Sequence, residues 1–127
     1  MRLSEVEYAT LMRSRTAVHE PFLASPGTKE GHENTLLAEV RRLAKMHGWL
    51  CYHTYNSKRS DEGFPDVVLV REAVIFAELK SRTGKPSHAQ HIWLRMLERT
   101  GDVEVYLWRP QDLPQMTARL TRPWRGT

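Results

Sequence analysis

The chain has 127 residues, which allows one domain with one hydrophobic core. Hydrophobic residues make up 40% of it, and no run approaches the ~18 consecutive apolar residues of a membrane span. The single cysteine excludes an internal disulfide and a cysteine-based zinc site. The mixed, polar first residues predict a protein without a secretory signal. The low cysteine content predicts a reducing, cytoplasmic setting. The net charge of +4 is compatible with nucleic-acid binding but does not establish it.

Three regions are expected along the chain. Residues 1–31 should form an N-terminal arm, because Ser4 and Glu7 have the spacing of a helix capping box and a linker-like stretch with prolines and a glycine follows. Residues 32–110 should form the core. Residues 111–127 should form a short helix and a basic tail that carries most of the excess positive charge. An arm or tail that packs on a partner chain is an open alternative to a mobile one.

The first element of the core is a helix predicted over residues 33–47, which Gly48 ends. Its apolar stripe follows the i, i+3, i+4 spacing: Leu36, Leu37, Val40, Leu43, Ala44 and His47. At about 100° per residue Glu33 falls near the centre of this stripe, whereas Glu39 lies about a quarter-turn away. Acids favour helix N-termini because of the helix dipole, so Glu33 has a purely structural explanation. The functional alternative is that Glu33 points into a cleft shared with acids from the sheet.

A strand is expected over residues 49–55, and a hairpin within residues 63–80. Cys51 is expected to be a small buried side chain, and His53 a strand residue with a local hydrogen bond rather than a metal ligand. In the hairpin, two apolar runs stand on either side of the turn-like residues 71–73, which predicts two central strands buried on both faces.

Charged residues stand at one end of this hairpin. Asp66 opens the first run, and Glu78 and Lys80 close the second. Side chains alternate along a strand, and the start of one hairpin strand lies beside the end of the next, so these three side chains should converge. Two carboxylates and an ammonium group suit Mg²⁺-assisted phosphodiester hydrolysis, in which the carboxylates bind the metal and the lysine orients the attacking water. A plain salt bridge between Glu78 and Lys80 is the structural alternative.

Two polar loops flank these residues in sequence, one before Asp66 and one after Lys80. They are expected to contact nucleic acid through hydroxyl, cationic and backbone groups, with ordinary solvated turns as the alternative. The candidate contacts are Ser57, Lys58, Arg59, Ser60, Arg82 and Lys85. A helix should then begin at the capping box of Ser87 and Gln90 and end at Gly101. Residues 103–108 should form a last strand, parallel to residues 74–80 because a helix connects them.

The residues also resemble a known family. Pro65-Asp66, eleven intervening residues and then Glu78-x-Lys80 resemble the PD-(D/E)xK nuclease motif, which by itself is weak. The longer pattern, over roughly residues 32–110, is similar to the more specific VRR-NUC (virus-type replication-repair nuclease) branch. That pattern comprises Glu33, Gly48-Trp49, Tyr52-His53, Gly63-Phe64-Pro65-Asp66, Glu78-Leu79-Lys80, Gln90, Trp93-Leu94 and Gly101.

The resemblance implies an α/β restriction-endonuclease-like core of order αβββαβ around a mixed sheet. It implies a Mg²⁺-dependent DNA endonuclease, with Mn²⁺ able to substitute, in replication, recombination or repair. Asp66 and Glu78 would hold the metal with Glu33 as a further ligand, and Lys80 would activate the water. Similar nucleases place a glutamine beside the active lysine. For Gln90 we therefore favour the site over the cap, expecting that one side chain cannot fully serve both.

The predicted partner is branched DNA, such as a four-way junction, cut by a homodimer. Nothing in the chain suggests a specificity domain or a nucleotide-binding loop, so structure-guided cutting is favoured, without a nucleotide cofactor and away from membranes. Two symmetric nicks require two sites, which a two-fold dimer supplies. The setting implied by similar stand-alone nucleases is a bacterial or phage-infected cell. A catalytically silent DNA-binding module and a nuclease acting on RNA are the alternatives.

Overall fold

The computed structural model describes Ser4, Val6, residues 32–54 and residues 61–124, except for the side chains of residues 32–34. The rest of the predicted arm helix, the loop Ser57–Ser60 and the last three residues of the tail lie outside this part. The elements are α2 (His32–Met46), β1 (Leu50–His53), β2 (Val67–Val70), β3 (Val74–Leu79), α3 (His88–Arg99), β4 (Glu104–Trp108), the 3₁₀ helix η1 (Pro110–Asp112) and α4 (Leu113–Thr121). In these residues no helix combines the length and the apolar character needed to cross a membrane.

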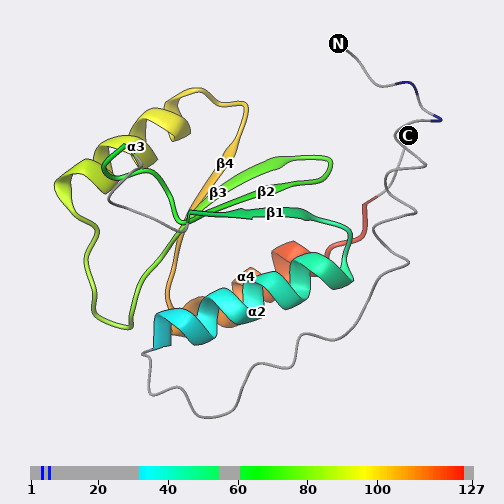
Figure 1. Ribbon diagram of the computed structural model, residues 1–127, viewed down its shortest axis with the longest axis horizontal. Coiled ribbons are helices and arrows are strands. Elements are labelled where there is room, and N and C mark those ends of the chain that lie inside the picture. Colours follow the sequence, from blue (N-terminus) through cyan, green and yellow to red (C-terminus); the bar gives the residue numbers. More distant parts are fainter. Residues whose placement is uncertain (1–3, 5, 7–31, 55–60, 125–127) are drawn as a thin grey trace.

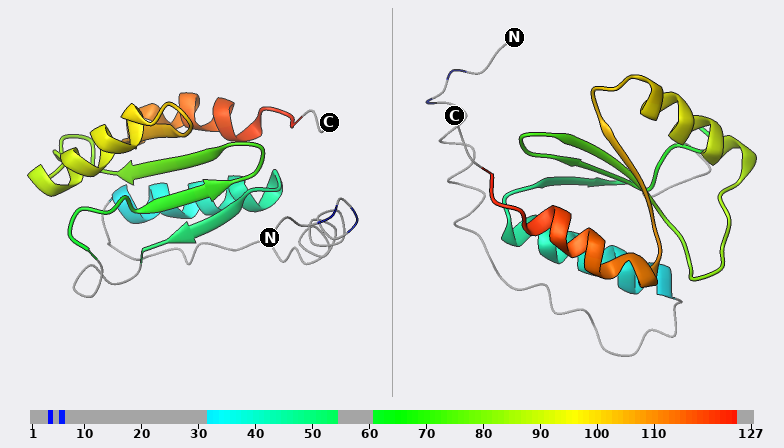
Figure 2. Two further views of the ribbon diagram at one scale, coloured as in Figure 1. Left: turned by 90° about the horizontal axis from the view of Figure 1, so that it is seen from above. Right: turned by 180° about the vertical axis from the view of Figure 1, so that it is seen from behind.

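The four strands form one mixed sheet in the order β1-β2-β3-β4. The first three are antiparallel neighbours, and β4 runs parallel to β3 after the crossover through α3. Helices α2 and α4 lie together against one face, and α3 lies on the opposite side (Figures 1 and 2). The predicted α/β fold with a central mixed sheet is therefore confirmed, including the direction of its last strand.

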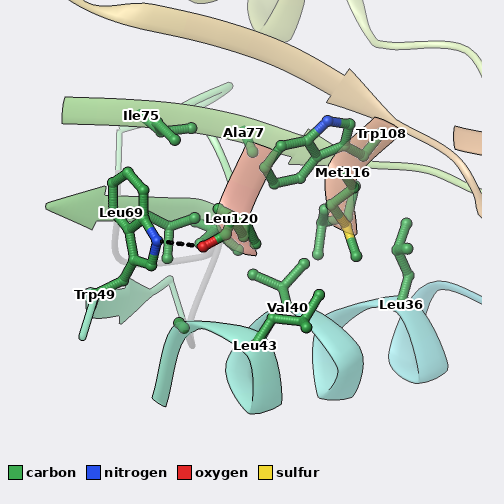
Figure 3. Close-up of a cluster of buried hydrophobic side chains, with 13 residues drawn as sticks. Leu36, Val40, Leu43, Trp49, Leu69, Ile75, Ala77, Trp108, Met116 and Leu120 are labelled. Atoms are coloured by element: carbon green, nitrogen blue, oxygen red, sulfur yellow. Dashed lines mark hydrogen bonds between the residues drawn. The ribbon is translucent and has the colours of Figure 1, made fainter. Parts of the chain in front are cut away.

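The main core fills the space between the sheet and helices α2 and α4 (Figure 3). It draws on the predicted stripe of α2, the inward side chains of the strands and two residues of α4. Its members are Leu36, Val40, Leu43, Ala44, Trp49, Val67, Leu69, Ile75, Ala77, Leu79, Trp108, Met116 and Leu120. The indole Nε1 of Trp49 donates a hydrogen bond to the carbonyl of Leu120 at 3.0 Å, which ties the end of α4 to the start of β1.

The opposite face of the sheet is less completely covered. Phe64 packs edge-on against Phe76 of β3 and Trp93 of α3, with ring centroids 6.1 and 5.2 Å away. These aromatic contacts hold α3 over the β3 side of the sheet, whereas Tyr52 on β1 stays 60% exposed. Because each strand alternates its side chains, residues 66 and 78 belong to this more open face.

Candidate active site

Asp66 and Glu78 meet at the end of the sheet where β2 begins and β3 ends. Val67 pairs with Ala77, so continuing the antiparallel register by one residue sets Asp66 opposite Glu78. The Asp66 carboxylate accepts a hydrogen bond from the backbone N–H of Leu79, with Oδ2 2.9 Å from the nitrogen. Glu78 is only 1% exposed, which is unusual for a carboxylate. The neighbouring acids are thus fixed by the sheet itself.

Lys80 adds a positive charge to the two acids. Its backbone N–H donates to the carbonyl of Trp108 at 2.9 Å, which continues the β3–β4 pairing by one residue. Its Nζ lies 3.9 Å from Oε1 of Glu78, and its side chain is 17% exposed. This separation is longer than a hydrogen bond, so the ammonium group stands beside the carboxylate without a tight contact. The predicted convergence of the three charged groups is present in the structure.

Gln90 joins helix α3 to the acids. Its Oε1 accepts from the backbone N–H of Ser87 at 2.8 Å, and its Nε2 donates to Oε1 of Glu78 at 3.1 Å. The Ser87 hydroxyl oxygen accepts a hydrogen bond from the Gln90 N–H, so the capping box is complete. Our expectation that one side chain cannot serve both the cap and the site was wrong, because an amide offers an acceptor at one end and donors at the other.

The turn that precedes Asp66 is held by contacts with α3 on one side and with the end of β1 on the other. Gly63 has φ +91°, and a Cβ at this position would lie 2.4 Å from the carbonyl carbon of Ala89, so only glycine fits. The indole Nε1 of Trp93 donates to the carbonyl of Glu62 at 3.1 Å. On the other side, Thr54 donates to the carbonyl of Pro65 through Oγ1 and to that of Asp66 through its N–H.

The VRR-NUC domain matches residues 4–109, most of the chain. The chain belongs to the VRR-NUC family. The family implies a nuclease-type function with DNA as the substrate, and the suspected resemblance is confirmed. No match was found among curated proteins or among solved structures. The match begins inside the predicted arm, and the division into arm, core and tail stays a prediction.

In this VRR-NUC chain the loop after Lys80 is anchored by the residues that follow β4. Arg109 donates through Nη2 to the carbonyl of Gly84 at 2.8 Å, and Gln111 donates through Nε2 to the carbonyl of Arg82 at 3.0 Å. Arg82 and Lys85 are exposed on this loop, as contact with nucleic acid requires. No pattern in the sequence pointed to Arg109 or Gln111, because the two segments are far apart along the chain.

Two predicted parts of the site, the side chain of Glu33 in the first turn of α2 and the loop Ser57–Ser60, are outside the described residues. Glu39 forms an ion pair with Arg42 on the surface of α2, and the hydrogen bond from Arg42 lowers its pKa. His53 alternates onto the face of the sheet opposite to Tyr52, and burial lowers its pKa.

A cavity of about 150 Å³ opens between α2, η1 and α4, lined by Thr35, Leu36, Glu39, Pro110 and Leu113.

The described donor set fits a hard cation. Asp66 and Glu78 supply carboxylate oxygens from adjacent strands, and Mg²⁺ commonly takes one or two protein carboxylates plus waters and substrate phosphate. Among the side chains that the structure describes, no cluster of three or more histidine, cysteine, aspartate or glutamate residues forms a fuller metal cage. Oxygen ligands in this number favour Mg²⁺ over zinc, which prefers sulfur and nitrogen.

Proposed function

We propose that this protein is a Mg²⁺-dependent endonuclease that hydrolyses phosphodiester bonds in branched DNA. The observation that carries the proposal is the meeting of Asp66, Glu78 and Lys80 at one end of the sheet, with Gln90 bonded to Glu78. Membership in the VRR-NUC family supports the nuclease class independently of this geometry.

Each residue has a chemical role in the proposal. Asp66 and Glu78 would hold the metal, and hydrogen bonds from the Leu79 N–H and the Gln90 side chain fix the orientation of the two carboxylates. When bound, Mg²⁺ supplies Lewis acidity to the phosphate and a lowered pKa for an attacking water. Lys80 orients that water and offsets the negative charge that develops on the phosphate oxygens. Mn²⁺ has the same preference for oxygen ligands and should substitute.

Glu33 is proposed as a further acidic ligand. The first turn of α2 stands at the same end of the molecule as the acid-bearing end of the sheet (Figure 1). Glu33→Ala should therefore lose far more cleavage activity than the matched control Glu39→Ala, whose carboxylate pairs with Arg42. Equal losses for the two variants would remove Glu33 from the proposed metal site.

Branched DNA and a homodimer are the finer parts of the proposal. The described residues form one α/β fold around one set of converging acids, and a pair of symmetric nicks across a junction needs two such sites. Ile92 and Met96 support an interface, because they lie one helical turn apart on α3 and are 49% and 56% exposed.

A cleavage panel tests the substrate and the metal together. Single strands, duplexes, flaps and four-way junctions, each in DNA and RNA versions, are incubated with Mg²⁺, with Mn²⁺ and with a chelator. The proposal predicts metal-dependent cutting of DNA, strongest on branched forms. Preferential cutting of RNA, or cutting that survives chelation, would contradict it.

Light scattering coupled to size exclusion tests the dimer in the same samples. A monomer at micromolar concentration that prefers linear duplex would overturn the branched-DNA and dimer parts while leaving the nuclease standing. Tight DNA binding without cleavage by the wild-type protein under any metal condition would instead favour a silent binding module.

A further inference from the structure

Tyr52 is an exposed aromatic side chain on the same face of the sheet as the proposed metal ligands. It pairs with Val68 across β1 and β2, and Val68 lies two residues after Asp66. Alternation along β2 directs Asp66 and Val68 to one face, and the cross-strand pair brings Tyr52 to that face as well. The Tyr52 residue is 60% exposed, in contrast to its neighbours on the core side of the sheet.

Strand geometry sets how close Tyr52 lies to the acids. Thr54 donates its N–H to the carbonyl of Asp66, so Tyr52 is the diagonal neighbour of Asp66 across the two strands. Such diagonal residues are separated by roughly 7–8 Å, within the reach of an aromatic side chain. The phenol ring therefore stands close to the Asp66 carboxylate, which would hold the metal that binds the phosphate.

An apolar strip, which no described helix covers, continues from Tyr52 away from the acids. The next cross-strand pair on this face is Leu50 with Val70, and these residues are 41% and 36% exposed. Helix α3 packs over β3 and β4, so it leaves the β1–β2 side of this face open. The strip thus begins beside the proposed site and is exposed on the same face of the sheet.

We propose that Tyr52 stacks on an unpaired base of the nucleic acid next to the cleaved phosphate, an inference that rests on the proposed nuclease function. An exposed aromatic ring offers a stacking surface to any base, whereas a base inside a duplex is already stacked on its neighbours. A strand whose phosphate lies at the metal that Asp66 and Glu78 would hold passes over Tyr52, because the ring and the acids share one face of the sheet. The preferred substrate then has at least one unpaired nucleotide beside the cut.

The nucleic acid is favoured over a second copy of the chain as the occupant of this strip. The strip is continuous with the acids, so a protein surface seated on Tyr52 would obstruct the approach of the phosphodiester. A base stacked there accompanies the phosphate and leaves the site accessible.

Binding of DNA flaps tests the stacking directly. The probe is a flap whose unpaired nucleotide at the branch is 2-aminopurine, a fluorescent base quenched by stacking, bound in Ca²⁺ to Glu78→Gln protein to prevent cleavage. Tyr52→Val keeps the strand propensity of the position and removes the ring, and Tyr52→Phe keeps the ring. We expect Tyr52→Val to lose the quenching and roughly 5- to 150-fold in affinity for the flap, with Tyr52→Phe close to the parent. A blunt duplex should bind the three proteins equally.

The outcomes separate the inference from the function on which it rests. Equal quenching and equal flap affinity for Tyr52→Val and its parent would overturn the inference even if the wild-type protein cleaves DNA. An altered mass in light scattering without a change in quenching would assign the strip to a second copy instead and would also overturn it. Failure of the wild-type protein to cleave any substrate would overturn the nuclease, while the quenching experiment would still report on Tyr52.

Discussion

Charged side chains have different kinds of neighbours at the two ends of the sheet. At the hairpin end, the guanidinium groups of Arg71 and Arg119 lie 4.3 and 5.1 Å from the centre of the Trp49 ring. Arg119 forms two hydrogen bonds with Glu104, at 2.7 and 2.6 Å, and Arg71 pairs with Glu72. At the other end, Asp66 lies opposite Glu78 on the neighbouring strand, and Lys80 stands beside Glu78.

The difference separates charges that are paired within the fold from charges that we propose take part in catalysis. We call Arg71, Arg119, Trp49, Glu72 and Glu104 the arginine cluster. Each guanidinium group in it has a carboxylate as its hydrogen-bonding partner, as buried charges require. The adjacent carboxylates at the other end repel each other until a cation arrives. Substitutions at the two ends should therefore have opposite consequences for stability and activity.

The largest expected effect is the loss of cleavage in Asp66→Asn, Glu78→Gln and Lys80→Ala. Each variant should lose at least about 10²-fold in rate, because it removes a proposed metal ligand or the group that activates the water. The free energy of unfolding without metal should stay equal or rise in Asp66→Asn and Glu78→Gln, which remove like-charge repulsion, and should fall in Lys80→Ala, which takes the positive charge from beside the buried Glu78. Cleavage rates on a flap and urea unfolding of the same samples measure both quantities. A near wild-type rate in any of the three would remove that residue from the site.

The arginine cluster should show the reverse behaviour. Arg119→Met removes both bonds to Glu104 and the contact with Trp49, and should lower the free energy of unfolding by about 2 kcal/mol. The cleavage rate of the folded protein should be unchanged. The matched control is Arg42→Met, which breaks an exposed ion pair with Glu39 and should cost less than about 1 kcal/mol. Equal losses of stability in the two variants would show that the cluster has no special role.

Gln90 allows the cap and the site to be separated. In Gln90→Glu a carboxylate can still accept from the Ser87 N–H, so α3 should keep its capping box, while the new charge beside the buried Glu78 lowers the stability of the fold. The bond donated to Glu78 is lost, and the cleavage rate should fall by roughly 10- to 100-fold. The complementary change, Ser87→Ala, should cost about 1 kcal/mol in stability with a smaller loss of rate. A larger loss of rate in Ser87→Ala would mean that Gln90 acts only through the helix.

The smallest expected effect is on the pH dependence of stability. The hydrogen bond from Arg71 lowers the pKa of Glu72 from 4.5 to about 2, and the bond from Arg119 lowers the pKa of Glu104. Both carboxylates have a lower pKa in the folded state, so their contribution is complete above about pH 4.5 and declines as the pH falls toward 2. Urea unfolding at pH 7, 4 and 3 should show this decline, with a shallower slope in Arg119→Met. Parallel slopes would contradict the assignment to the cluster.

The sequence predicted the elements and the meeting of the acids because both depend on local patterns. The apolar runs around residues 71–73 set the hairpin, and alternation then placed Asp66 beside Glu78. Contacts between distant segments left no such pattern: the pair Arg119–Glu104 and the bond from Arg109 to the loop after Lys80 appear only in the folded chain. The turn glycine Gly63 was part of the recognised motif, but its contact with Ala89 depends on how α3 packs.

Calorimetric titration with Mg²⁺ tests the central claim, that the acid end of the sheet is a metal site, most directly. The wild-type protein should bind Mg²⁺ in a saturable manner, and Asp66→Ala should abolish that binding, because Asp66 supplies one of the two carboxylates fixed by the sheet. Arg119→Met should bind like the wild-type protein while folded, since its changes lie at the opposite end. Indistinguishable binding curves for the wild-type protein and Asp66→Ala would contradict the account.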